Sequence, residues 1–198
     1  GIYVIAGGYM ATAINDFIQG IIMLFGIVAV IAAVLKGNGG FTEAINSLAN
    51  VQDAAASSQS GVFASFFGAD PLGLLGVVIL TSLGTWGLPQ MVQKFYAIKD
   101  ESSIKKGTII STIFALIVSG GCYFLGGFGR LYSDKVDIAS QGYDSIIPTM
   151  LSDLSPALIG IVIILVLSAS MSTLSSLVMA SSSTLTIDFL KDNFVKKM

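Results

Sequence analysis

The stretch Ser168-Ala-Ser-Met-Ser-Thr-Leu-Ser-Ser176 places many hydroxyl groups inside an otherwise apolar segment that runs from Leu158 to Leu177. In a lipid bilayer an unpaired hydroxyl group is unfavourable. Two arrangements would explain so many hydroxyls close together. One is close packing of a helix on its neighbour through small residues, and the other is coordination of a hard cation that prefers oxygen ligands. The pattern alone leaves these two interpretations about even.

The composition of the chain indicates an all-α membrane protein. Of its 198 residues, 54% are hydrophobic and only 11% are charged, whereas roughly a quarter of the residues of a soluble domain are charged. Several apolar stretches reach the roughly 20 residues that cross about 30 Å of hydrocarbon. These stretches are long and do not alternate with polar residues, so they predict helices rather than the strands of a barrel.

Four apolar segments, at about 8–35, 71–98, 108–128 and 156–188, are predicted to cross the bilayer within a single transmembrane region, residues 1–198. Polar residues predict loops at 37–70 and 130–155 and a charged linker at 99–107. The first loop is expected to hold a short helix at 42–50, and the second a short helix or a re-entrant turn at 146–148. The chain opens on an apolar stretch without a charged leader, so we expect it to be an internal piece of a longer membrane protein.

The second apolar segment is predicted to contain a broken helix. Asp70-Pro71 marks its start, because Asp caps helices and Pro suits the first helical turn. The stretch Gly84-Thr-Trp-Gly-Leu-Pro-Gln90 follows near mid-membrane, and its proline removes a backbone donor. Broken helices at this depth line cavities in transporters. A proline-kinked helix with packing glycines is the alternative.

Asp16 is the acid of the first apolar segment, and Gln19 shares its helix face. A carboxylate inside a spanning helix costs a few kcal/mol on insertion scales, so it usually faces protein, water or an ion. Asp16 is therefore a candidate functional residue. The alternative is a helix-entry residue near the lipid headgroups.

The distribution of Lys and Arg predicts the orientation in the membrane. Four crossings put the linker 99–107 and the C-terminal tail on one side, where seven Lys residues lie, against three Lys or Arg residues on the other side. By the positive-inside rule the side with seven is cytoplasmic. We therefore expect a multi-pass protein of the plasma (inner) membrane with both long polar loops external. Helix lengths then predict Asp16, Ser172 and Thr173 at similar depth in its inner half.

One carboxylate with neutral oxygen groups suits a monovalent cation, since Mg²⁺ and Ca²⁺ sites generally recruit more acids or waters. The carbonyl of Ala169 could join the hydroxyls of Ser172 and Thr173.

The sequence shows no enzyme constellation, because it has no His to activate a Ser and no phosphate-cradling Gly loop with its Lys. Its few basic residues lie at the membrane margins, which argues against nucleic-acid binding.

Three motifs together resemble the sodium/solute symporter family, which includes proline, pantothenate, acetate, sialic acid and sugar carriers. The motifs are the hydroxyl run 168–176 with 181–189, Gly7-Gly-Tyr-Met-Ala11 with Asp16 and Gln19, and Gly87-Leu-Pro-Gln-Met-Val-Gln-Lys-Phe95. The third motif is nearest to the Gly-Leu-Pro-His form of acetate and pantothenate carriers, with Gln90 in place of the His. The resemblance extends over essentially the whole chain.

The resemblance implies a LeuT-type fold of two inverted five-helix repeats, of which this chain would hold the fifth to eighth core helices. It also implies a sodium site that uses the Ala169 carbonyl and the hydroxyls of Ser172 and Thr173, whereas Asp16 matches the acid of a further cation site. The remaining sodium ligands would come from a core helix outside this chain. Substrate contacts would lie near Thr81, Thr85, Trp86, Pro89 and Gln90.

We therefore expect sodium-coupled secondary active transport of a small organic solute, such as a monocarboxylate, pantothenate or an amino acid. Sodium is the expected co-transported ion. The other expected partners are the lipid bilayer and the missing helices of the same full-length chain. The alternative is a non-transporting transmembrane sensor or scaffold module, and a packing scaffold would show no effect of sodium on its thermal stability.

Overall fold

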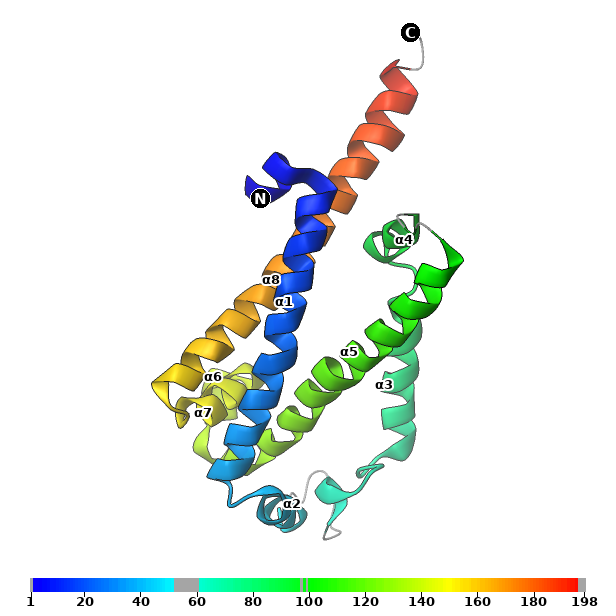
Figure 1. Ribbon diagram of the computed structural model, residues 1–198. Helices are drawn as coiled ribbons and strands as arrows, with labels where there is room; N and C mark the ends of the chain where they lie inside the picture. The colour runs from blue at the N-terminus through cyan, green and yellow to red at the C-terminus, as the bar shows by residue number, and fades with distance from the viewer. Residues whose placement is uncertain (1, 52–60, 97, 99, 196–198) are drawn as a thin grey trace.

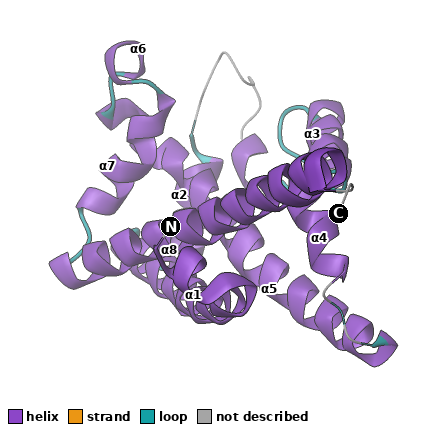
Figure 2. Ribbon diagram, turned by 90° about the horizontal axis from the view of Figure 1, so that it is seen from above, coloured by secondary structure: helices purple, strands orange, loops and turns teal. Residues whose placement is uncertain are grey.

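The computed structural model describes residues 2–51, 61–96, 98 and 100–195. All regular structure in these residues is helical, which confirms the all-α prediction. Two long helices, α1 (Ile2–Gly37) and α8 (Pro156–Ser183), pack against each other, and a third, α5 (Glu101–Gly127), packs against α1 (Figure 1). Figure 2 shows the same helices from above, with α5 pointing away from the α1–α8 pair.

Three helical stretches among the described residues are long and apolar enough to cross a membrane, namely Val4–Gly37, Glu101–Lys135 and Pro156–Lys191. A fourth apolar helix, α3 (Pro71–Gly84), has 14 residues. Many large apolar side chains on all four helices are exposed. So much exposed apolar surface is unusual for a protein surrounded by water and suits contact with lipid and with further helices.

Helix α1 is bent at Gly8, whose backbone angles of φ 57° and ψ −151° lie outside the helical range. Glycine adopts a positive φ at little cost because it has no Cβ. The bend sets the first part of the helix at an angle to the rest (Figure 1). The helix begins at Ile2, before the expected start near residue 8. Beside the bend, the Thr12 hydroxyl donates a hydrogen bond to the Gly8 carbonyl at 3.0 Å.

The second apolar segment is interrupted in the structure, since α3 ends at Gly84 and α4 (Pro89–Tyr96) begins at Pro89. Asp70 caps α3, because its carboxylate accepts a hydrogen bond from the Gly73 N–H at 2.9 Å. Pro89 stands at the first position of α4, where its missing N–H has no helical partner to lose. Helix α4 packs against α8, whereas α3 has no buried residue.

Helix α5 begins at Glu101, although the sequence predicted a linker up to residue 107 and a helix from 108. The reason is an N-cap, because Asp100 accepts hydrogen bonds from the Ser103 N–H and the Ser102 hydroxyl, both at 2.8 Å. These hydrogen bonds, the backbone one first, lower the pKa of the exposed Asp100 carboxyl. The stabilisation from the ionised Asp100 cap is therefore fully present above the ordinary Asp pKa. It is lost as pH falls through the lowered pKa of Asp100.

The two long connections fold into short helices at the end of the molecule where α1 and α5 meet. They are α2 (Phe41–Ala49), η1 (Val62–Ala64), η2 (Phe128–Lys135), α6 (Ile138–Gln141), η3 (Tyr143–Ser145) and α7 (Ile146–Ser152). Apolar side chains of α1, α2, α5, η2 and α7 form one buried core here, which includes Val34, Ala44, Leu125, Phe128 and Met150. The polar loops expected at 37–70 and 130–155 therefore contribute to the main core of the described chain.

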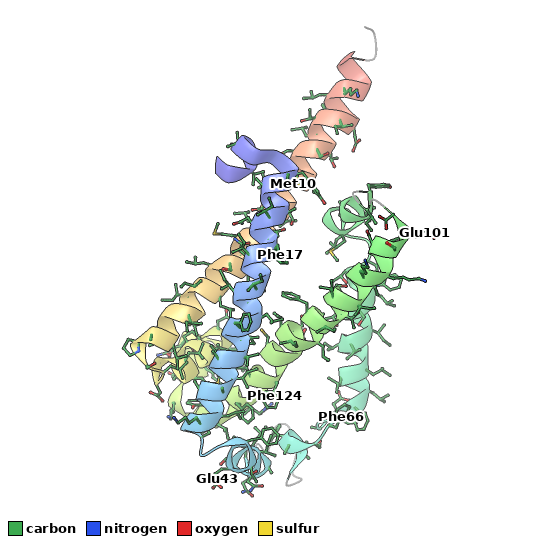
Figure 3. The ribbon with its side chains drawn as sticks, in the orientation of Figure 1. Met10, Phe17, Glu43, Phe66, Glu101 and Phe124 are labelled. Atoms are coloured by element: carbon green, nitrogen blue, oxygen red, sulfur yellow. The ribbon has the colours of Figure 1, made fainter. Side chains whose placement is uncertain are left out.

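Aromatic and polar contacts join these short helices to the long ones. The amide of Asn38, just beyond α1, donates a hydrogen bond to the Tyr132 hydroxyl of η2 at 3.3 Å. The rings of Phe41 and Phe124 stack with their centroids 6.3 Å apart. Figure 3 shows Phe124 where α5 approaches α1 and α2, whereas Glu101 lies at the opposite end of α5, away from α1.

Helices α1 and α8 are in close contact at Gly26. A Cβ atom at this position would lie 2.9 Å from Cδ1 of Leu165 and 3.6 Å from Cγ2 of Ile161. Small residues at such crossings allow helix backbones to come close together in membranes. Beyond Ser183, α8 continues as a π-helix, Thr184–Val195, past the end near residue 188 that the sequence predicted.

We predict that Gly26→Val, made in the full-length protein, lowers its thermal unfolding temperature. The added side chain would overpack the α1–α8 contact, which typically costs about 1–3 kcal/mol. The matched control is Gly120→Val in α5, because a Cβ atom at Gly120 meets nothing within 4 Å. Equal unfolding temperatures for the two variants would contradict the close approach at Gly26.

Candidate functional site

A polar stripe of Thr12, Asn15, Asp16 and Gln19 interrupts the apolar surface of α1. Thr12 and Gln19 are each 5% exposed, and the other two side chains are half-buried. Within the described structure, Asn15 Nδ2, Asp16 Oδ1 and Gln19 Oε1 are buried and have no hydrogen-bond partner. An unsatisfied buried polar group costs about 1–3 kcal/mol. The stripe is therefore costly for a helix that serves packing alone.

A hydroxyl stripe of Ser168, Ser172 and Ser175 lies on one face of α8. The spacing of four and three residues keeps the three side chains on the same side of a helix. Ser168 and Ser175 are 6% and 5% exposed, and Ser172 between them is half-buried. The Ser175 hydroxyl donates a hydrogen bond to the Met171 carbonyl at 2.7 Å.

The contact at Gly26 shows how the two stripes are aligned. Gln19 precedes Gly26 by seven residues, and Ser172 follows Leu165 by seven residues. Seven residues fall only about 20° short of two full turns. Gln19 therefore lies on the same face of α1 as Gly26, and Ser172 lies on the same face of α8 as Leu165. Because α1 and α8 run in opposite directions (Figure 1), these two steps lead the same way along the helix pair. Gln19 and Ser172 therefore lie at the same level between the helices.

Ala169 and Thr173, the other predicted sodium ligands on α8, are linked by a hydrogen bond. The Thr173 hydroxyl donates to the Ala169 carbonyl at 3.1 Å. Thr173 is exposed and points about 100° away from Ser172, as adjacent residues of a helix do. The structure thus places Ser172 toward α1 and Thr173 on the neighbouring face. A donating hydroxyl keeps its lone pairs, so this hydrogen bond leaves the Thr173 oxygen able to bind a cation.

Asp16 lies at the edge of the polar stripe, between the face of α1 that packs on α8 and the face that packs on α5. It borders a cleft of about 550 Å³ between α1 and α5. The cleft is otherwise mainly apolar, with Phe17, Gly20, Ile21, Leu24, Gly107, Ile110, Ser111, Ile113 and Phe114 in its walls. The carboxylate is thus the charged group of an apolar cleft, with one oxygen turned into the protein.

The predicted substrate residues are not gathered in one cavity with Asp16. The hydroxyls of Thr81 and Thr85 donate to carbonyls of their own helix, at 2.8 Å for Thr81 and 3.4 Å for Thr85. Trp86, in the turn after α3, is 76% exposed. Pro89 borders a cleft of about 730 Å³ between α4 and the end of α8, which also includes Ser181, Thr184 and Asp188. The side chain of Gln90 lies outside the described residues.

Sequence reasoning named Gln19 only as a neighbour of Asp16, and it gave Asn15 no role. The spacing of 12, 15, 19 and 26 was the available signal, because these positions share one helix face. In the sequence alone that face looked like the start of a spanning helix. The burial of this face results from its packing against α8, a segment distant in the sequence.

The donor set favours a monovalent cation. Among the described residues, no group of three or more His, Cys, Asp or Glu side chains could hold a metal ion. The Asp16 carboxylate, the Ala169 carbonyl and the hydroxyls of Ser172 and Thr173 offer hard, mostly neutral oxygen ligands. Such a set balances a single positive charge.

The model of the Sodium:solute symporter family matches residues 1–198. The chain is 30% identical over 198 residues to the sodium/pantothenate symporter of Haemophilus influenzae. The matched region covers 98% of this chain and 38% of that protein. The chain is 29% identical over 191 residues to the Escherichia coli sodium/pantothenate symporter, with 94% and 37% covered. It is also 29% identical to sodium/proline symporter 2 of Staphylococcus saprophyticus, with 96% and 35% covered.

No solved structure gave a significant match. The chain spans little more than a third of the length of these relatives, between 35% and 38%.

We predict that Asp16→Leu in the full-length protein abolishes any rise of the unfolding temperature in sodium over choline buffer. A ligand that binds the folded state stabilises it by about 1.4 kcal/mol at ten times its Kd, and the variant lacks the carboxylate. In choline the variant should be at least as stable as the parent, since it no longer buries an unpartnered oxygen. Asp134→Leu, which removes an exposed carboxylate, is the control. An undiminished sodium effect in Asp16→Leu would rule Asp16 out.

Proposed function

Because the chain belongs to the sodium:solute symporter family, we propose that its full-length protein couples the inward sodium gradient to the uptake of a small organic solute. The match over residues 1–198 confirms the resemblance that the motifs predicted, and the relatives are symporters rather than enzymes. One observation of the structure carries the proposal. It is the buried polar stripe of α1 at the level of the hydroxyl stripe of α8, with unpartnered oxygens between two spanning helices.

The sodium site of this proposal uses Asp16, the Ala169 carbonyl, and the hydroxyls of Ser172 and Thr173. Two features support it: Ser172 faces α1 at the level of the polar stripe, and the Ala169 carbonyl adjoins the Thr173 hydroxyl. The site is incomplete within this chain, because Thr173 is exposed. Its remaining ligands belong to helices outside the chain, which is consistent with a chain that spans 38% of its Haemophilus relative.

In the proposed fold, α3, the break and α4 form a fourth crossing. The two parts have 14 and 8 residues, which at 1.5 Å per residue are about 21 Å and about 12 Å long. An interrupted crossing of this kind fits the LeuT-type inverted repeat, in which broken helices form the substrate site. The fully exposed α3 would then be covered by the missing helices of the same chain.

The proposed substrate site lies at this break, near Thr81, Thr85, Trp86, Pro89 and Gln90. Trp86 offers an exposed aromatic surface, and the regular helix is interrupted between Gly84 and Pro89. Candidate substrates are pantothenate and proline, after the names of the relatives, and monocarboxylates. Sodium bound between α1 and α8 would stabilise one state of an alternating-access cycle and so link the ion to the solute.

We predict sodium-dependent uptake of one of these solutes into proteoliposomes that contain the full-length protein. Ser172→Ala combined with Thr173→Ala should abolish the sodium dependence, because it removes two neutral ligands. The control pair is Thr108→Ala with Thr112→Ala on α5, whose hydroxyls are exposed and bonded to carbonyls of their own helix. An unchanged sodium response in the first pair would refute the ligand assignment. Absence of uptake for every solute would favour the sensor or scaffold alternative.

The proposed orientation has the linker 99–107 and the C-terminal tail in the cytoplasm of a plasma (inner) membrane. The excess of Lys on that side supports it. In intact cells, a full-length variant without other cysteines, including Cys122→Ser, should react with a membrane-impermeant maleimide at Asp134→Cys and not at Lys105→Cys. The reverse labelling pattern would invert the topology.

A further inference from the structure

Gln19 is the most deeply buried amide side chain of the polar stripe, and the proposed sodium site does not use it. Its side chain is 5% exposed, and its Oε1 atom has no hydrogen-bond partner within the described structure. By contrast, the equally buried Thr12 is satisfied by the Gly8 carbonyl of its own helix. The amide of Gln19 therefore requires an explanation that simple burial between helices does not give.

The direction of Gln19 follows from the contact between α1 and α8. Gly26 lies on the face of α1 that meets Leu165, and Gln19 lies two turns away on that face. Ser172 is displaced by the same two turns from Leu165 on α8. The Gln19 side chain thus faces the space between the helices at the level of Ser172. Asp16, at the edge of the stripe beside α5, also has one buried oxygen without a partner in the described structure.

Three buried polar atoms of this stripe have no hydrogen-bond partner within the described structure. Two of them, Asp16 Oδ1 and Gln19 Oε1, are acceptors, and one, Asn15 Nδ2, belongs to a donor group. Asn15 and Gln19 are four residues apart, so their side chains are neighbours on the helix. The Asn15 –NH2 group carries two N–H donors, yet its nitrogen meets no acceptor within the described structure. The two acceptors thus have no donor, and together with the negative charge of Asp16 they favour a cation, because hard cations bind carboxylate and amide oxygens together.

We propose that Gln19 supplies its amide oxygen as a ligand to the sodium ion held by Asp16 and α8. This inference rests on the proposed function and adds α1 ligands to it. The site would then contain a carboxylate and an amide oxygen from α1, together with the Ser172 hydroxyl from α8. The α1–α8 pair itself would close around the ion, in addition to any ligands from helices outside the chain.

The test is a sodium titration of the purified full-length protein, with ²²Na⁺ binding as the readout and the unfolding temperature in choline as a second measurement. We expect Gln19→Leu to weaken sodium binding by about tenfold or more, the loss that one ion–dipole ligand implies. Gln19→Glu should retain binding, because it keeps a side-chain oxygen at the same reach. Thr12→Val is the matched control, equally buried on the same face, and should leave the sodium Kd unchanged.

A purely structural Gln19 would give a different result. Gln19→Leu would then change the unfolding temperature in choline and leave the sodium Kd at the parent value, which would overturn the inference. If Gln19→Leu does not fold, loss of binding in Gln19→Glu would overturn it equally. If the parent protein itself binds no sodium, the proposed function fails and this inference fails with it. Normal binding by the parent and by Gln19→Leu overturns the inference alone.

Discussion

The close contact of α1 with α8 at Gly26 determines where the polar groups of the candidate site lie. Because Gly26 has no side chain, Leu165 and Ile161 can approach the α1 backbone. This contact shows which faces of the two antiparallel helices meet. Two turns away, the same faces carry Gln19 on α1 and Ser172 on α8. A larger residue at position 26 would separate the two stripes as well as the helices.

The described chain is packed unevenly along its length. At the end formed by α2, η2 and α7, apolar side chains of several elements form one core, and Asn38 bonds to Tyr132. Toward the other end, α5 leads away from α1 (Figure 1), and the space beside Asp16 is a cleft of about 550 Å³. One end of the helix pair is thus held by apolar packing, and the other carries buried polar atoms without partners in the described structure. That difference suits a transporter, whose ion site must respond to what occupies it.

Several features of the fold could be predicted from local chemistry. The helix start at Asp70-Pro71 and the interruption before Pro89 each depend on one or two residues with strong backbone preferences. The early start of α5 was missed because Asp100 looked like part of a charged linker, although Asp followed by Ser is also a capping pattern. The helices of the two polar connections were underestimated, because their apolar residues are sparse and are buried only by contact with α1 and α5.

The candidate site was predicted in part. Asp16 and Ser172 could be named from the sequence because a membrane-embedded acid and a hydroxyl run are both unusual. Gln19 and Asn15 could not be given a role, because burial on the α8-facing side depends on how two distant segments pack.

The most direct test of the central claim is the structure of the full-length protein determined in sodium at a resolution that shows bound ions. Our account predicts an ion between α1 and α8, within coordination distance of a side-chain oxygen of Asp16 or Gln19 and of the Ser172 hydroxyl. A structure in which these side chains instead bond directly to one another, with the ion bound elsewhere, would contradict it.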